Sequence, residues 1–372
     1  MRVGFRIVLF FLMLCVFVRE MSAEANWVDY AAADFAGGDG TNEAPYLIDS
    51  AERLARLAYL VNGAQDDLDG KKFLEKSYRQ IADIDLSGRS WLPIGAAYVD
   101  SSDIVPSFAG HYDGNSYAIR NVVIRSDGFA TGLFCSAFGE EDRRVILENI
   151  RLVSVDVLGY RVNTGTLVGV TGHSELRSCS VNGGTVVLQG GIWVGLGGLV
   201  GINDGTGTIR GCSVDVRVAT DNEREGNGDA SAGGIIGINK GLLVDSAASG
   251  DVLASVGGDA LDYCRAGGIV GLNDGGMIQN CIASGDVYIG RKTSGGPLVG
   301  RDNGTVTDSS GSGKVIKIVP GKDVADENDH LWNIVAAVAT PPGMIVVLLC
   351  LILIAALVAL WFFVRWMRKS EK

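Results

Sequence analysis

The sequence predicts an all-β fold, a right-handed parallel β-helix with a small N-terminal helical cap and one C-terminal transmembrane helix. The main observation is a pattern of glycine, two apolar residues, glycine, an apolar residue and asparagine that recurs along the chain. Its copies are Gly198–Gly205, Gly234–Gly241, Gly268–Gly275 and a degenerate Pro297–Gly304. Repetition at a period of roughly 30 residues is typical of stacked solenoids and not of compact enzyme domains.

The second observation is the regular spacing of the glycine that closes each copy, which predicts one coil per repeat. These closing glycines are Gly169, Gly201, Gly237, Gly271 and Gly300, with separations of 32, 36, 34 and 29 residues. Two further strand patterns follow each copy, for example Met277–Cys281 and Ser284–Ile289. Three short strands with Gly and Asn at the corners predict a triangular coil whose neighbours pair in parallel.

The third observation is an asparagine at the same turn position of three copies: Asn203, Asn239 and Asn273. Stacked asparagines can hydrogen-bond from coil to coil, so we expect a structural ladder and not a ligand site. A second column of small residues indicates an inward stack, and its members are Cys179, Cys212, Ser246, Cys281 and Ser309. Cys179 and Cys212 on adjacent coils fall within disulfide range, although free buried thiols are the favoured state.

An amphipathic helix is predicted at Ala51–Asn62, ahead of the repeats. Asp49 is the expected N-cap, Glu52 completes a capping box, and Gly63 ends the helix. Its apolar face comprises Leu54, Leu57, Ala58 and Val61. Because the first coil of a solenoid exposes an open core, we expect this helix to cover it. Residues 26–128 therefore form the cap and first coils, and residues 129–318 form the repeat β-helix.

Both ends of the chain carry apolar segments that predict export and membrane anchoring. Residues 1–25 combine a basic start, the apolar run Ile7–Val18 and an Ala-x-Ala cleavage pattern, as a signal peptide does. An uncleaved anchor is the alternative. Ile345–Val364 is free of charge and long enough to cross a bilayer, so residues 344–364 are expected to be a transmembrane helix. A buried soluble helix is the alternative there.

The expected topology places the repeats outside the cell membrane. Residues 319–343 form a spacer, and residues 365–372 form a short cytoplasmic tail whose basic residues satisfy the positive-inside rule. The formal net charge of −11 argues against nucleic acid and other polyanions as partners, because those need a basic patch. The cysteines show no CxxC or CxxH spacing, so neither a metal site nor any other cofactor is predicted.

The repeats resemble the GLUG motif of bacterial surface proteins, which is named for its Gly-Leu-x-Gly core. The resemblance covers roughly residues 130–315, and the segment Gly37–Ile48 looks like the entry segment that precedes such coils. Cys135, Pro297 and Arg301 depart from the pattern at its two ends. The resemblance implies an exported, bacterial, adhesin-like protein. Some GLUG-bearing proteins are peptidases, but on domains separate from the repeats.

Acidic residues of the early coils are the candidates for catalysis, since parallel β-helices also host polysaccharide lyases and hydrolases. Asp83 and Asp85 lie two apart in a probable strand and could share a cation, and Asp113 precedes a Gly-Asn turn. The resemblance gives these sequences a plainer role in turns and coil entry. A structural role is therefore favoured, and a membrane-tethered polysaccharide-cleaving enzyme is the alternative.

Exposed aromatic residues are the candidates for ligand binding, because aromatic faces on a long surface suit glycans or proteins. They are expected in the inter-strand loops and comprise Tyr160, Trp193, Tyr263 and Tyr288. The loops at 220–231 and 255–266 vary most in length and are the expected place for a site. Asp204 and Asp274 could collect calcium weakly but are expected to be solvated turn residues. The sequence thus favours a non-catalytic surface protein for adhesion or envelope structure.

Overall fold

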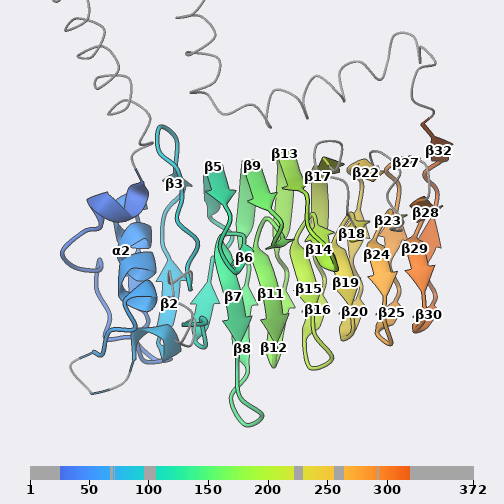
Figure 1. Ribbon diagram of the computed structural model, residues 1–372. Coiled ribbons are helices and arrows are strands. Elements are labelled where there is room, and N and C mark those ends of the chain that lie inside the picture. Colours follow the sequence, from blue (N-terminus) through green and yellow to red (C-terminus); the bar gives the residue numbers. More distant parts are fainter. Residues whose placement is uncertain are drawn as a thin grey trace, which may run out of the picture. The chain divides into compact units, whose positions relative to one another are not determined.

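The computed structural model is a parallel β-solenoid in which strands from successive coils lie side by side along one axis (Figure 1). It describes residues 26–67, 70, 72–95, 106–221, 229–254, 264–290 and 293–318, all within one compact unit. The pairs between named strands are parallel throughout this described part. The predicted all-β solenoid is therefore confirmed.

The coil has four strands and not the three that we predicted. The recurring Gly-Leu-Val-Gly pattern is not one strand, because Gly198 and Leu199 form a corner between β14 (Val194–Gly197) and β15 (Val200–Asn203). Each full coil therefore contributes to four parallel sheets, numbered here in the order in which the chain visits them. In the last coils the contribution to the second sheet is split into two short strands, for example β21 and β22. The glycine-rich composition concealed the extra strand, since it resembles a turn.

The first and second sheets extend along the whole described solenoid. The first consists of β1 (Tyr46–Ile48), β2 (Ser77–Gln80), β4 (His111–Asp113), β8 (Val145–Glu148), β12 (Ser174–Arg177), β16 (Thr208–Arg210), β20 (Leu242–Val244), β25 (Met277–Gln279) and β30 (Thr305–Thr307). The second consists of β3 (Ile84–Asp85), β5 (Ala118–Ser126), β9 (Arg151–Tyr160), β13 (Ser180–Gln189), β17 (Ser213–Asp221), β21 (Ala247–Ala248), β22 (Val252–Ala254), β26 (Ile282–Ala283), β27 (Val287–Ile289), β31 (Ser310–Gly311) and β32 (Val315–Lys317).

The third and fourth sheets are shorter and begin later in the chain. The third consists of β6 (Ala130–Thr131), β10 (Asn163–Thr164), β14, β18 (Ala230–Gly233), β23 (Cys264–Gly267) and β28 (Thr293–Gly296). The fourth consists of β7 (Phe134–Phe138), β11 (Val168–Gly172), β15, β19 (Ile236–Asn239), β24 (Val270–Asn273) and β29 (Val299–Asp302). The GLUG-like copies thus provide the corner and fourth-sheet strand of each coil.

The closing glycines have a steric cause. A Cβ added at Gly237 in β19 would lie 2.3 Å from the backbone nitrogen of Leu196, in the third-sheet strand of the preceding coil. Gly201, Gly271 and Gly300 meet the preceding third-sheet strand in the same way. The third and fourth sheets therefore pack too closely for any side chain at this position. Cys135 can replace the glycine because β6 is the first third-sheet strand in the described part of the chain.

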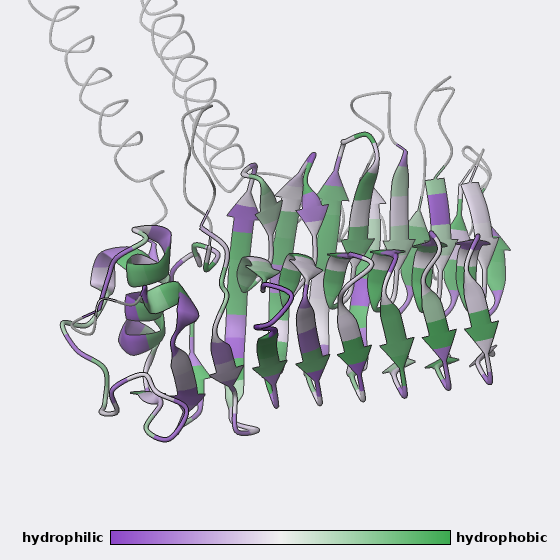
Figure 2. Cartoon of the chain, turned by 90° about the horizontal axis from the view of Figure 1, so that it is seen from below, coloured by the Kyte–Doolittle hydropathy of each residue, from purple (hydrophilic) through white to green (hydrophobic). Residues whose placement is uncertain are grey.

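The solenoid core is a continuous column of inward side chains. In the first sheet it runs in register from aromatic to aliphatic residues: Tyr78, Tyr112, Leu147, Leu176, Ile209, Leu243, Ile278 and Val306. Hydrophobic residues recur along the strands of successive coils, as Figure 2 shows. The aromatic rings of this column lie in the first coils and the aliphatic residues in the regular repeats.

Helix α2 (Ala51–Asn62) covers the first coil at the expected residues, flanked by the short 3-10 helices η1 (Trp27–Tyr30) and η2 (Phe73–Glu75). Its predicted apolar face is fully buried in the core. The predicted N-cap was wrong. Ser50 caps the helix by accepting from the Arg53 N–H at 3.4 Å, and Asp49 instead pairs with the Arg53 side chain. With Ser50 as N-cap, Glu52 does not complete a capping box.

The predicted signal peptide (1–25), spacer (319–343), transmembrane helix (344–364) and tail (365–372) lie outside the described residues. Among the residues that are described, no helix combines the length and the hydropathy needed to cross a membrane.

Candidate functional site

The asparagine column forms the expected ladder, but inside the solenoid and at strand ends instead of in turns. The Asn203 amide donates to the Asn239 oxygen at 2.9 Å, Asn239 donates to Asn273 at 3.0 Å, and Asn273 donates to the Asp302 carboxylate at 2.7 Å. All three asparagines are fully buried. Their amide nitrogens bond the next rung and, for Asn203 and Asn239, an adjacent turn, so the ladder links successive coils. The Asn203 oxygen, at the first rung, is buried without a hydrogen-bond partner among the described residues.

The corner between the first and second sheets has one left-handed residue in every repeat coil. These residues are Asn149, Ser178, Gly211, Asp245, Asn280 and Asp308, with φ between 48° and 61°. The small residue that follows each of Ser178, Gly211, Asp245 and Asn280 points inward and is buried, which places the predicted column of Cys179, Cys212, Ser246 and Cys281 there. Cys179 and Cys212 are free thiols, and burial raises the pKa of the Cys179 thiol well above its usual value.

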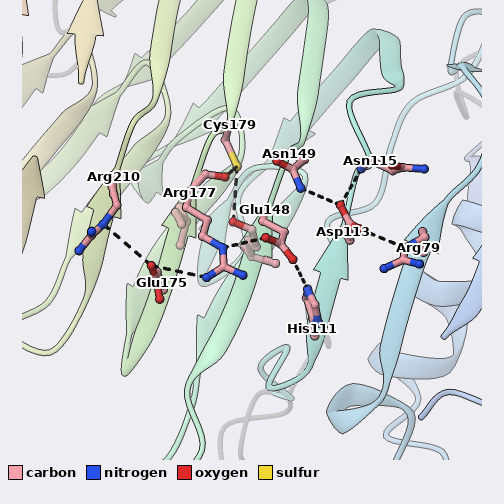
Figure 3. A network of polar contacts seen from close by, with 12 residues as sticks. Arg79, His111, Asp113, Asn115, Glu148, Asn149, Glu175, Arg177, Cys179 and Arg210 are labelled. Carbon is pink, nitrogen blue, oxygen red and sulfur yellow. Dashed lines mark hydrogen bonds and ion pairs between the residues drawn. The ribbon is translucent and has the colours of Figure 1, made fainter. Parts of the chain in front are cut away.

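A charged network covers the outer face of the first sheet, and sequence reasoning missed it. Figure 3 shows its members projecting from neighbouring strands. They occupy one register column immediately before the left-handed corner: Arg79, Asp113, Glu148, Arg177 and Arg210. The signal that could have revealed the column is a charged residue at the last position of β12 and β16, in register with one at the end of β8.

The carboxylates of this network are fully engaged with donors. Glu148 accepts from Arg177 Nε and bonds His111 Nε2, each at 2.7 Å. Asp113 accepts from the Asn115 N–H at 2.8 Å, from the Asn149 side chain at 3.0 Å and from Arg79 at 3.1 Å. Each carboxylate thus pairs with an arginine of an adjacent coil, Asp113 with Arg79 and Glu148 with Arg177.

These contacts lower the pKa of both carboxyl groups. Burial alone would raise the pKa of Asp113, but the hydrogen bonds from Asn149, Asn115 and Arg79 outweigh it. The same balance holds at Glu148, where burial is outweighed by Arg177 and His111. A glycosidase needs one carboxyl group with a raised pKa that can deliver a proton. For both Asp113 and Glu148 the direction of the shift is opposite to the one that such a proton donor requires.

Asp83 and Asp85, the other catalytic candidates, bind the adjacent coil. Asp83 accepts from the Ala118 N–H at 2.8 Å and from Arg120 at 2.9 Å. Asp85 accepts from the Asn121 side chain and the Ser87 N–H, each at 2.9 Å. These hydrogen bonds lower the pKa of each carboxyl group, the one from Ala118 most at Asp83 and the one from Asn121 most at Asp85.

The turn acids are also engaged in local contacts. Asp204 accepts from the Thr206 N–H at 2.8 Å, and Asp274 pairs with Lys240 at 3.5 Å. Within the described residues, no group of three or more His, Cys, Asp or Glu side chains could hold a metal ion.

The aromatic candidates do not share one setting. Tyr160 ends β9 and Tyr288 lies within β27, both half-buried, so the prediction that they lie in loops was wrong. Trp193 lies in the loop before β14 and is 67% exposed. Tyr263 is outside the described residues, as are most of the two loops at 220–231 and 255–266. Apart from Asp229, the described parts of those loops belong to strands: β17 and β18 in the first, β23 in the second.

The comparison with protein families agrees with this architecture. Residues 194–219 and 262–288 match the family described as "The GLUG motif". Each match begins at or near the third-sheet strand of its coil and includes the corner and the fourth-sheet strand.

Two curated proteins match at 34% identity. Halomucin of Haloquadratum walsbyi matches over 169 residues, which is 44% of this chain and 2% of halomucin. A "Putative Gly-rich membrane protein" of Evansella cellulosilytica matches over 145 residues, 36% of this chain and 14% of that protein. This chain therefore spans only a small part of the length of either relative.

A crystal structure of a "putative immunoglobulin A1 protease" from Bacteroides ovatus is similar in fold, with a TM-score of 0.51 at 19% identity. The match covers 82% of this chain and 93% of that one. An identity this low indicates a shared fold only. The chain carries GLUG-motif repeats, and these repeats build its parallel β-solenoid.

Proposed function

We propose that this chain is a non-catalytic surface protein that presents its GLUG solenoid outside the cell for adhesion or envelope structure. The main support for this proposal comes from the hydrogen bonds and the pKa of its carboxyl groups. Asp83, Asp85, Asp113 and Glu148 each bind donors of neighbouring strands or turns, and each has a lowered pKa. Charges committed to holding coils together are not available for proton transfer.

The placement at the cell surface rests on the sequence. Residues 1–25 have the pattern of a signal peptide, and residues 344–364 have the length and hydropathy of a membrane anchor. The match to a protein named for a membrane location supports this assignment. An anchored solenoid has a long lateral surface, which suits binding to glycans or to proteins of the envelope.

The competing function is a membrane-tethered enzyme that cleaves polysaccharides. One observation favours it: Asp113 and Glu148 are in register on adjacent coils, about 5 Å apart along the solenoid. Retaining glycosidases hold two carboxyl groups at a similar separation. The lowered pKa of both groups opposes this function, since the proton donor of such a pair has a raised pKa.

Antibody access on intact cells tests the proposed display. The full chain would carry one epitope tag within residues 255–263 and, in a second version, one after Lys372. We expect antibody to bind the first tag on intact cells and the second only after permeabilisation. Binding to the C-terminal tag on intact cells, or to neither tag before permeabilisation, would refute the proposed topology.

A further inference from the structure

The coil formed by residues 293–318 is the last one in the described part of the chain, and all four sheets end in it. Its strands β28, β29, β30, β31 and β32 each pair with the preceding coil alone among the described residues. A sheet edge presents unpaired backbone groups that can pair with another chain, so proteins commonly protect such edges. We call residues 293–318 the last coil.

The corner between the third and fourth sheets donates a hydrogen bond to the following coil in each of three preceding GLUG copies. The donor is the backbone N–H of the first glycine of the copy. The bonds are Gly198 to the Gly233 carbonyl at 3.1 Å, Gly234 to Gly267 at 3.2 Å and Gly268 to Gly296 at 3.4 Å. Pro297 occupies this position in the last coil, and proline has no backbone N–H. The last coil therefore lacks the donor that a following coil would satisfy.

The asparagine ladder also ends in the last coil without a donor. Each asparagine donates its amide to the next coil, and Asp302 is the register partner of Asn273 at the end of the ladder. The Asp302 carboxylate accepts from Asn273 at 2.7 Å and from the Gly304 N–H of its own turn at 3.0 Å. A carboxylate accepts hydrogen bonds and donates none. Asp302 thus completes the ladder and presents no amide to a further coil.

Charged residues replace apolar ones in two columns of the last coil. Arg301 continues a column of the fourth sheet whose earlier members are Ile202, Ile238 and Leu272. Lys317 is in register with Ile289, an inward core residue that is 4% exposed. Both Arg301 and Lys317 are exposed. A further coil stacked on this end would cover both charges, and burying an unpaired charge is costly.

The glycines of the last coil that face the preceding coil are retained. A Cβ at Gly300 would lie 2.6 Å from the Ala266 nitrogen, and one at Gly304 would lie 2.2 Å from the Gly276 oxygen. The motif is therefore kept where it packs backward and altered where it would bind forward. General decay of a repeat would not produce this difference between the two directions.

We propose that the last coil is a terminating coil, which closes this end of the solenoid to stacking by a further coil or by a second copy of the chain. Pro297 and Asp302 remove donors, and Arg301 and Lys317 place charges where apolar residues would be buried. Proline and charges are the features by which natural sheets prevent edge pairing. Helix α2 covers the first coil, so each end of the solenoid is closed in its own way. The inference is independent of the surface function proposed above.

The test restores the residues of the preceding coil in the full chain. The four-residue variant carries Pro297→Gly, Arg301→Leu, Asp302→Asn and Lys317→Ile. We expect it to fold, because each new residue is the one in the matching position of the preceding coil. Since α2 covers the other end, two such chains can associate only through their last coils. Light scattering in detergent micelles should therefore show an increase of about twofold in protein mass per particle over the wild type.

The matched control carries Arg210→Leu and Asp215→Asn. Both residues are exposed and lie on β16 and β17, in the middle of the solenoid and not at its end. The control changes charge in the same way and exposes the same leucine side chain on a lateral face. Its protein mass per particle should equal that of the wild type.

A four-residue variant that is folded by circular dichroism but keeps the wild-type mass per particle would overturn the proposal. An equal increase in the lateral control would also overturn it, because the association would then reflect exposed apolar surface in general. Amine cross-links between Lys314 of two wild-type copies would show that the last coil is not closed. If the four-residue variant does not fold, the variant Arg301→Leu, Asp302→Asn decides by the same criteria.

Discussion

At the scale of single residues, the solenoid depends on positions where only one side chain fits. Asn239 illustrates a polar requirement, because it accepts from Asn203 and donates to Asn273 and to the Gly241 carbonyl in a fully buried setting. Gly237 illustrates a steric one, because the preceding coil occupies the space of its Cβ. The glycine recurs in all four copies of the pattern, and the asparagine recurs in three of them, with Asp302 in its place in the fourth. Both positions reflect the packing of one coil on the next.

Asn239→Ala should destabilise the solenoid by about 1–3 kcal/mol, because the Asn203 amide and the Asn273 oxygen lose a buried partner. Chemical denaturation of the full chain would measure the change. Asn182→Ala is the control: Asn182 is exposed on β13, and its removal should change stability by about 0.5 kcal/mol or less. Equal effects of the two substitutions would refute the ladder's structural role.

Gly237→Ala should cost about 3 kcal/mol or more, because a methyl group 2.3 Å from a backbone nitrogen forces two sheets apart. Gly205→Ala is the counterpart, since its Cβ would meet only the Lys240 carbonyl oxygen, at 3.8 Å. Thermal unfolding should show a large loss for the first and almost none for the second. A Gly237→Ala variant as stable as the wild type would contradict the close packing of the third and fourth sheets.

At the scale of elements, the two faces of the first sheet have different roles. Their inward residues build the core, and their outward residues link coils through charge, as Glu148 does between His111 on β4 and Arg177 on β12. The outer face of the first sheet, where the candidate catalytic pair Asp113 and Glu148 lies, thus carries the charged network. Partial exposure of Arg79 and Arg177 keeps each pair's contribution modest.

The carboxylates of this charged network make the stability of the fold depend on pH. The folded pKa of Asp113 and Glu148 lies below the unfolded values of about 4. Their stabilisation is therefore complete above the unfolded pKa and is lost as the pH falls through the folded one. Melting temperature measured from pH 6 to about pH 2 should fall more steeply for the wild type than for the double variant Asp113→Asn, Glu148→Gln. Parallel curves would exclude these carboxylates as the acid-sensitive contacts.

The sequence was most informative where one residue type is obligatory at each repeat. The helix Ala51–Asn62 and the asparagine column could be predicted, because periodicity and recurrence are local signals. The N-cap could not, since Asp49 and Ser50 are both suitable capping residues. The fourth strand could not, since Val194–Gly197 is as small and glycine-rich as a turn. The charged network could not be predicted either, because its register depends on coil lengths that differ from copy to copy. The contact of the Arg265 guanidinium with the ring of Trp193, two coils earlier, has no local signal either.

At the scale of the whole molecule, the residues that stabilise the coil are distinct from those that form its variable surface. The core, the asparagine ladder and the glycine column fix the coil, and the corner loops are free to differ between coils. This division is expected of repeat proteins, in which insertions fall on one side and form the binding surface. The corner loops are therefore the part of the solenoid that can vary without disturbing its core.

The most direct measurement is turnover of purified polysaccharides by the folded full chain, followed as new reducing ends and as unsaturated products. The account predicts no product above the level given by the double variant Asp113→Asn, Glu148→Gln. Product that forms with the wild type and disappears in that variant, while the variant stays folded, would contradict the account and establish the enzyme instead.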